Sequence, residues 1–208
     1  MRTRRGFELA AVILLAAAGV GRADIIHYHT TLTGPAESPP NTSPGTGDAT
    51  VIIDTAANTM EVIVTFSGLT SGTTASHIHA ATALPGTGTA GVATTTPTFP
   101  GFPLGVTSGS YDQLFNLLSA SSYNPAFVTA NGGSVPASEA ALLSALGSDR
   151  AYLNIHTTNF PSGEIRGFLL PQAAVPEPSS FTLLALGVGA LAGWRRWRKR
   201  HAAAPFRS

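Results

Sequence analysis

Three histidines have the residue type and the spacing of metal ligands. His77 and His79 form a His-x-His pair, and His156 lies in a second apolar run that begins at Tyr152. Alternate residues of a strand point to the same face, so His77 and His79 would project together while Ile78 faces the core. A neighbouring strand that carries His156 would add a third imidazole. Three neutral imidazoles suit copper or zinc.

The same histidines could instead belong to a polar network that holds no ion. Buried polar side chains normally hydrogen-bond to one another, and several such residues lie near the histidines in the expected strands. Glu164 and Arg166 are two residues apart, so they would share a strand face and could pair with each other. The candidate network residues are Glu37, Asn154, Glu164 and Arg166. The sequence leaves both interpretations open.

The segments that must position these side chains have the alternating pattern of β-strands. Two β-branched runs joined by a short turn predict a hairpin over residues 49–66. Strands are expected over residues 26–33, 49–54, 60–66, 76–80, 152–156 and 164–170, and short helices over residues 111–118 and 136–146. Several short strands with few helices favour an all-β fold, an antiparallel β-sandwich or barrel of immunoglobulin-like or superoxide-dismutase-like type.

Charge is distributed unevenly along the chain. The 208 residues carry a net charge of +1 and no cysteine, but only two basic residues, Arg150 and Arg166, lie between residues 24 and 175. Nine acidic residues lie in the same interval, so two positive charges against nine negative ones leave it at −7. Such a surface repels phosphate backbones, which excludes nucleic acid as a partner and favours cations or neutral polymers.

The N-terminal segment has the composition of an export signal. Residues 1–23 combine a basic start, an apolar run and small residues at the end, which predicts a secretory signal peptide cut after Ala23. The partners implied are the Sec translocon and signal peptidase. Residues 24–172 would then form a single β domain.

The C-terminal segment, residues 173–208, has three parts in a fixed order. Pro176, Glu177 and Pro178 precede an apolar run over residues 181–194, and an arginine-rich end follows. The run is short for a hydrocarbon core, which suits a temporary transmembrane helix. This order resembles the PEP-CTERM sorting signal of Gram-negative bacteria. The resemblance implies an exosortase as partner, a transient anchor in the inner membrane, and release to the cell surface or extracellular matrix.

Three segments of the expected β domain resemble the CHRD domain family. They are Gly-Pro-Ala-Glu-Ser-Pro-Pro at 34–40, Ala-Ser-His-Ile-His at 75–79, and Tyr-Leu-Asn-Ile-His-Thr at 152–157 with Gly-Glu-Ile-Arg-Gly at 163–167. The resemblance extends over about residues 26–170, the whole of the expected domain. It implies an extracellular domain that could present a surface to another protein.

Two functional hypotheses follow. The first is a non-enzymatic binding or adhesion module that meets extracellular polysaccharide or proteins, because no convincing catalytic set of residues is visible. The alternative is an extracellular copper or zinc protein, which could be redox-active, built on His77, His79 and His156.

Overall fold

The structure is a computed structural model that describes residues 25–172 and residues 191, 194–195 and 197–198. The chain divides into two units, Met1–Pro171 and Gln172–Ser208. The expected signal peptide, the Pro176-Glu177-Pro178 tripeptide and most of the apolar run over 181–194 lie outside the described residues. Among the residues that are described, no helix is long and apolar enough to cross a membrane.

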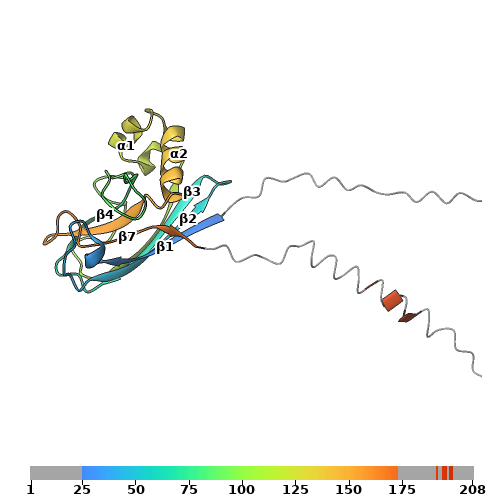
Figure 1. Ribbon diagram of the computed structural model, residues 1–208, viewed down its shortest axis with the longest axis horizontal. Coiled ribbons are helices and arrows are strands. Elements are labelled where there is room, and N and C mark those ends of the chain that lie inside the picture. Colours follow the sequence, from blue (N-terminus) through green and yellow to red (C-terminus); the bar gives the residue numbers. More distant parts are fainter. Residues whose placement is uncertain (1–24, 173–190, 192–193, 196, 199–208) are drawn as a thin grey trace, which may run out of the picture. The chain divides into compact units, whose positions relative to one another are not determined.

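The first unit contains one antiparallel sheet (Figure 1). Its strands lie in the order β4-β6-β7-β1-β2-β3-β5, and β8 pairs with β1. The strands are β1 (Ile25–Thr33), β2 (Thr46–Asp54), β3 (Thr59–Ser67), β4 (Thr73–His79), β5 (Gly109–Asn116), β6 (Tyr152–Thr157), β7 (Ile165–Phe168) and β8 (Leu170–Pro171). The sheet curls into a half-barrel, which confirms the prediction of an all-β antiparallel fold.

The hairpin of β2 and β3 forms as the alternation predicts. Val51 and Ile53 on β2 are fully buried, and so are Val62 and Val64 on β3. Their polar neighbours on both strands face outward, so one face of the hairpin is apolar. In the turn, the Asp54 carboxylate accepts hydrogen bonds from two backbone N–H groups, each at 2.9 Å. This turn fixes the register in which the two strands pair.

Two short α-helices, α1 (Pro125–Ala130) and α2 (Val135–Leu146), pack against each other (Figure 1). The Ser134 hydroxyl accepts a hydrogen bond from the first turn of α2, and Gly147 follows the last turn. Leu142 and Leu146 bury one side of this helix against the core. The prediction of a helix over 136–146 is confirmed, whereas α1 was not predicted. Residues 25–172 also contain two single turns of 3₁₀ helix, η1 (Gly34–Ala36) and η2 (Ala120–Ser122).

The prediction of a helix over residues 111–118 is wrong, because this segment forms the strand β5 and pairs with β3. Tyr111 and Phe115 are buried, while Leu114 and Leu118 are 59% and 57% exposed. A spacing of four places two residues on one face of a helix and also on one face of a strand. The pair Tyr111 and Phe115 therefore fits both structures, and hydrogen bonding to the free side of β3 decides between them.

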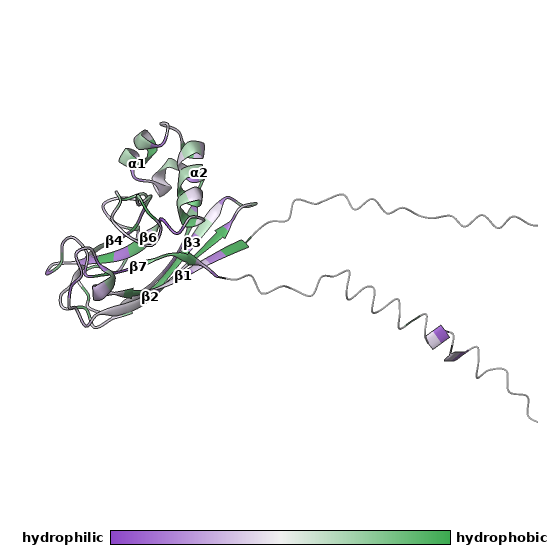
Figure 2. Cartoon of the chain, in the orientation of Figure 1, coloured by the Kyte–Doolittle hydropathy of each residue, from purple (hydrophilic) through white to green (hydrophobic). Residues whose placement is uncertain are grey.

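The core fills the inside of the curled sheet. Apolar side chains from the strands meet others from the helices and from the long segment between β4 and β5. Figure 2 shows apolar and polar residues mixed along the strands. The largest fully buried side chains are Phe99, Leu32, Ile53, Met60, Ile78, Leu117, Leu142, Leu146, Leu153, Ile155, Ile165 and Leu169. Ile78 is thus in the core, as the His-x-His pattern predicts.

Glu164 connects three separate segments just before β7. Its buried carboxylate accepts hydrogen bonds from the Ser43 hydroxyl and the Thr70 backbone N–H, both at 2.6 Å, and from the Thr157 hydroxyl. Burial alone would raise the pKa of Glu164, but these hydrogen bonds outweigh it and lower the pKa. The expected pair between Glu164 and Arg166 does not form, because the carboxylate is already engaged here.

Replacing this carboxylate should destabilise the domain. We expect Glu164→Gln to lower the free energy of unfolding by about 1.5–3 kcal/mol, because an amide offers one acceptor where the site presents donors from three segments. Chemical denaturation measures the loss. Asp112→Asn, on an exposed position of β5, is the matched control and should change little. Equal effects of the two variants would contradict this account of Glu164.

Candidate metal centre

The pairing of β4 with β6 brings the three histidines together. In this antiparallel pair His77 lies opposite Asn154, and His156 lies opposite Ala75. Because side chains alternate between the faces of a sheet, His77, His79, Asn154 and His156 all share one face. One ring nitrogen from each histidine lies within 4.8 Å of the other two. The structure therefore assembles the three residues that the sequence singles out.

Each imidazole ring is held in place by a backbone carbonyl. His77 Nε2 lies 2.5 Å from the Pro97 carbonyl oxygen, His79 Nδ1 lies 2.9 Å from that of Ala90, and His156 Nδ1 lies 2.9 Å from that of Pro161. A carbonyl oxygen can only accept, so the ring nitrogen in each pair carries the proton. The tautomer of every ring is thereby fixed, and its second nitrogen keeps a free lone pair.

These second nitrogens are buried and unpartnered. His77 Nδ1, His79 Nε2 and His156 Nε2 have no hydrogen-bond partner and no contact with solvent. A buried acceptor without a donor costs about 1–3 kcal/mol. Three such atoms in one cluster are the arrangement that a metal ion requires, because each metal–nitrogen bond uses one imidazole lone pair.

Burial keeps the three rings neutral. It lowers the pKa of His77 to about 4, against the opposing hydrogen bond to Pro97, and the neighbouring His156 and His79 add to the effect. The pKa values of His79 and His156 are lowered for the same reason. Only a neutral imidazole can donate a lone pair to a metal, so the cluster is in the ligand form at neutral pH.

The segment between β4 and β5 provides two of the three carbonyls. It runs along the outer edge of β4, where the Ala93 N–H donates to the Ile78 carbonyl at 2.9 Å and the Phe99 N–H donates to that of Ser76 at 3.1 Å. These bonds bring Ala90 and Pro97 over the histidines and cover the strand edge. The third carbonyl, Pro161, comes from the turn between β6 and β7.

A chain of stacked and charged side chains lies behind His79. The Tyr152 ring stacks on His79 with 4.8 Å between ring centres, and the Arg166 guanidinium lies 4.8 Å from the centre of the Tyr152 ring. Arg166 Nε in turn lies 3.8 Å from a Glu37 carboxylate oxygen. Burial raises the pKa of Glu37 to about 7, in opposition to the nearby Arg166. Of the four residues expected in a polar network, Glu37, Asn154 and Arg166 therefore lie beside the histidines, and Glu164 does not.

Strand alternation in the sequence already predicts that Tyr152 shares a face with Asn154 and His156, but it assigned this residue no role in the site. The three carbonyl oxygens were not predicted. The carbonyls of Ala90, Pro97 and Pro161 carry no residue-type information. Their position beside the histidines depends on how the loops fold, which the sequence does not show.

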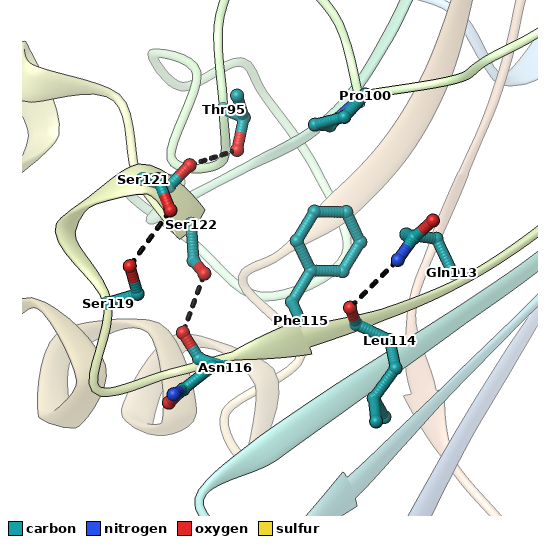
Figure 3. A pocket seen from close by; sticks show the side chains of 9 residues that line it. All are labelled: Thr95, Pro100, Gln113, Leu114, Phe115, Asn116, Ser119, Ser121 and Ser122. Carbon is teal, nitrogen blue, oxygen red and sulfur yellow. Dashed lines mark hydrogen bonds between the residues drawn. The ribbon is translucent and has the colours of Figure 1, made fainter.

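Two other described histidines, His27 and His29, and a shallow cavity lie away from this cluster. His27 is exposed, and His29 lies 3.6 Å from the exposed Asp48 carboxylate. A shallow cavity of about 430 Å³ has a rim of hydroxyl and amide groups, several of them bonded to one another (Figure 3). It is lined by Thr95, Pro100, Gln113, Leu114, Phe115, Asn116, Ser119, Ser121 and Ser122. None of these side chains is ionisable near neutral pH, so the cavity lining offers no general acid or base.

The buried histidines predict how the stability of the metal-free domain depends on pH. The pKa of His77 falls from 6.5 to about 4 on folding, so below pH 6.5 the unfolded chain takes up a proton that the folded chain does not. Stability is therefore lost as pH falls from about 6.5 towards 4. In His77→Gln this loss should be smaller by about 2 kcal/mol at pH 4.5, measured by urea denaturation in a chelator.

Glu37 has a raised pKa, so its contribution to stability changes with pH in the opposite direction to that of His77. This contribution is present in both the wild type and His77→Gln, so it cancels when the two are compared. His27→Gln, at an exposed position, should behave like the wild type. Identical acid profiles for the wild type and His77→Gln would contradict a neutral, buried His77.

Comparison with known families gives a match for the β domain and a match for the C-terminal segment. The CHRD domain family matches residues 28–169, and the PEP-CTERM protein-sorting motif matches residues 174–200. Comparison with curated proteins and with solved structures gave no match. The sorting motif implies an exported protein that an exosortase processes at the membrane. The chain is therefore a member of the CHRD domain family that carries a PEP-CTERM sorting motif after its CHRD domain.

Proposed function

We propose that this exported CHRD domain binds one copper or zinc ion outside the cytoplasm, through His77, His79 and His156. Two observations carry the proposal: each of the three imidazoles has a buried ring nitrogen without a hydrogen-bond partner, and one ring nitrogen of each histidine lies within 4.8 Å of those of the other two. Imidazole is a preferred ligand of both ions, and three histidines are a common protein contribution to a zinc site.

The hydrogen bonds around the rings support binding rather than a purely structural network. In a structural network each histidine would donate to another polar side chain of the cluster. Here each ring N–H donates to a backbone carbonyl, that of Ala90, Pro97 or Pro161, and the second nitrogen of each ring keeps its lone pair. Lone pairs repel one another, so the arrangement is favourable only with a cation among them. The fixed tautomers also mean that little reorganisation opposes binding.

Charge favours the same conclusion. The interval from residue 24 to 175 has a formal charge of −7, which raises the local concentration of cations around the domain. Neutral imidazoles bind without first releasing a proton when their pKa values lie below the ambient pH. The pKa of His77, at about 4, meets this condition even in mildly acidic surroundings.

We propose in addition that the Sec translocon and signal peptidase export the chain, that its C-terminal segment anchors it transiently in the inner membrane, and that exosortase processing leaves the metal-binding domain at the cell surface or in the matrix.

The finer hypothesis of an adhesion module for polysaccharide or protein has no specific support among the described residues. The shallow cavity lined by Thr95, Gln113 and their neighbours bears only hydroxyl, amide and apolar groups (Figure 3).

Metal titration tests the proposal. The purified protein, stripped with a chelator and titrated with Zn²⁺ or Cu²⁺ in a calorimeter, should bind one equivalent. His77→Ala, His79→Ala and His156→Ala should each lower the affinity at least about a hundredfold, because each removes one of three ligands. The double variant His27→Ala/His29→Ala removes two histidines outside the cluster and should bind like the wild type.

The test has a clear negative result. If the wild type binds neither ion above background, or if the control variant loses as much affinity as the cluster variants, the histidines are not a metal site. Circular dichroism of each variant establishes that it is folded, so that a loss of binding is not a loss of structure.

A further inference from the structure

A fourth unpartnered acceptor lies among the histidines. Among the described residues, the buried side-chain nitrogen and oxygen atoms without a hydrogen-bond partner are Glu37 Oε1, His77 Nδ1, His79 Nε2, Asn154 Oδ1 and His156 Nε2. The asparagine is 2% exposed, so bulk solvent does not reach its oxygen. An unpaired carbonyl oxygen in this position is costly and needs an explanation.

The sheet places Asn154 between the three rings. It lies directly opposite His77 across the β4–β6 pair, and it precedes His156 by two residues on the same face of β6. Its side chain is also within hydrogen-bonding reach of the His79 ring. Asn154 is therefore next to every member of the cluster.

The asparagine oxygen and the His79 ring cannot satisfy each other. His79 Nδ1 already donates to the Ala90 carbonyl, so the free Nε2 has only a lone pair to offer. The Asn154 oxygen can only accept. A second proton on His79 would create an imidazolium in a buried site, which desolvation opposes. Two acceptors that face each other in this way are stabilised by a cation bound to both.

The surroundings of the amide account for its orientation. A Cβ atom added to Gly163 would lie 2.8 Å from Asn154 Nδ2 and would collide with Glu37 Oε1, so the amide nitrogen lies on the side of the Glu37 carboxylate. This leaves the amide oxygen on the side of the histidines. Arg166 Nε lies 3.8 Å from the other Glu37 carboxylate oxygen, Oε2.

We infer that Asn154 Oδ1 is the fourth ligand of the metal ion and that the centre is a closed site for Zn²⁺, made of three imidazole nitrogens and one amide oxygen. This inference rests on the metal binding proposed above. An amide oxygen is a harder donor than imidazole and favours a divalent ion over Cu⁺. Four protein ligands complete a tetrahedral zinc site, so no position remains for a bound water. The closed site holds the ion and does not activate water for hydrolysis.

Cobalt substitution tests this assignment, because Co²⁺ absorbs visible light in a way that reports the number of its ligands, while Zn²⁺ does not. The full chain, its Asn154→Ala variant and its Asn154→Asp variant are loaded with one equivalent of Co²⁺ and titrated with azide. We expect azide to leave the wild-type spectrum unchanged and to shift that of Asn154→Ala, in which the fourth position is open. Zn²⁺ affinity should fall roughly tenfold in Asn154→Ala.

Asn154→Asp keeps an oxygen at the same place and adds a negative charge. We expect it to bind Zn²⁺ at least as tightly as the wild type and to remain insensitive to azide. It also serves as the informative variant should Asn154→Ala fail to fold.

Two negative outcomes are distinguishable. If the wild type binds neither Co²⁺ nor Zn²⁺, the metal site itself is wrong. If the wild type binds one ion but its spectrum shifts with azide, or if Asn154→Ala keeps full Zn²⁺ affinity, the three histidines bind without Asn154 and only the present inference is overturned.

Discussion

The register of β4 against β6 is the constraint on which the rest of the site depends. His77 lies opposite Asn154 on one face, while Ile78 and Leu153 lie opposite each other on the other face and are fully buried. A slip of either strand by one residue would put its polar side chains into the core and its apolar side chains into the site. The hydrophobic core thus fixes the register, and the register in turn brings the candidate ligands together.

The loops fix the orientation of the histidine rings that the strands bring together. Carbonyls at Ala90, Pro97 and Pro161 take the N–H of each ring, so every free lone pair is left inside the cluster. The rings stay neutral because they are buried, and the acidic domain around them attracts cations. A site formed in this way needs no cysteine, and the chain has none. The proposed metal binding is therefore compatible with a protein that is exported and sorted.

Part of this organisation could be predicted from the sequence. Strand alternation placed Ile78 in the core and predicted a hairpin over 49–66, because a period of two is visible in the residue types. It could not separate strand from helix at Tyr111 and Phe115, whose spacing of four fits both. Nor could it find the partners of Glu164, because Ser43 and Thr70 approach it only through the tertiary fold. The backbone carbonyls at the site could not be predicted either, because every residue has one and its residue type does not indicate which of them takes part.

Anomalous diffraction at the zinc absorption edge, from crystals of the zinc-loaded protein, tests the central claim most directly. The account predicts one strong peak about 2.0–2.1 Å from a nitrogen of each of His77, His79 and His156. A peak only beside His29 and Asp48 on the surface, or none at the three buried histidines, would contradict it.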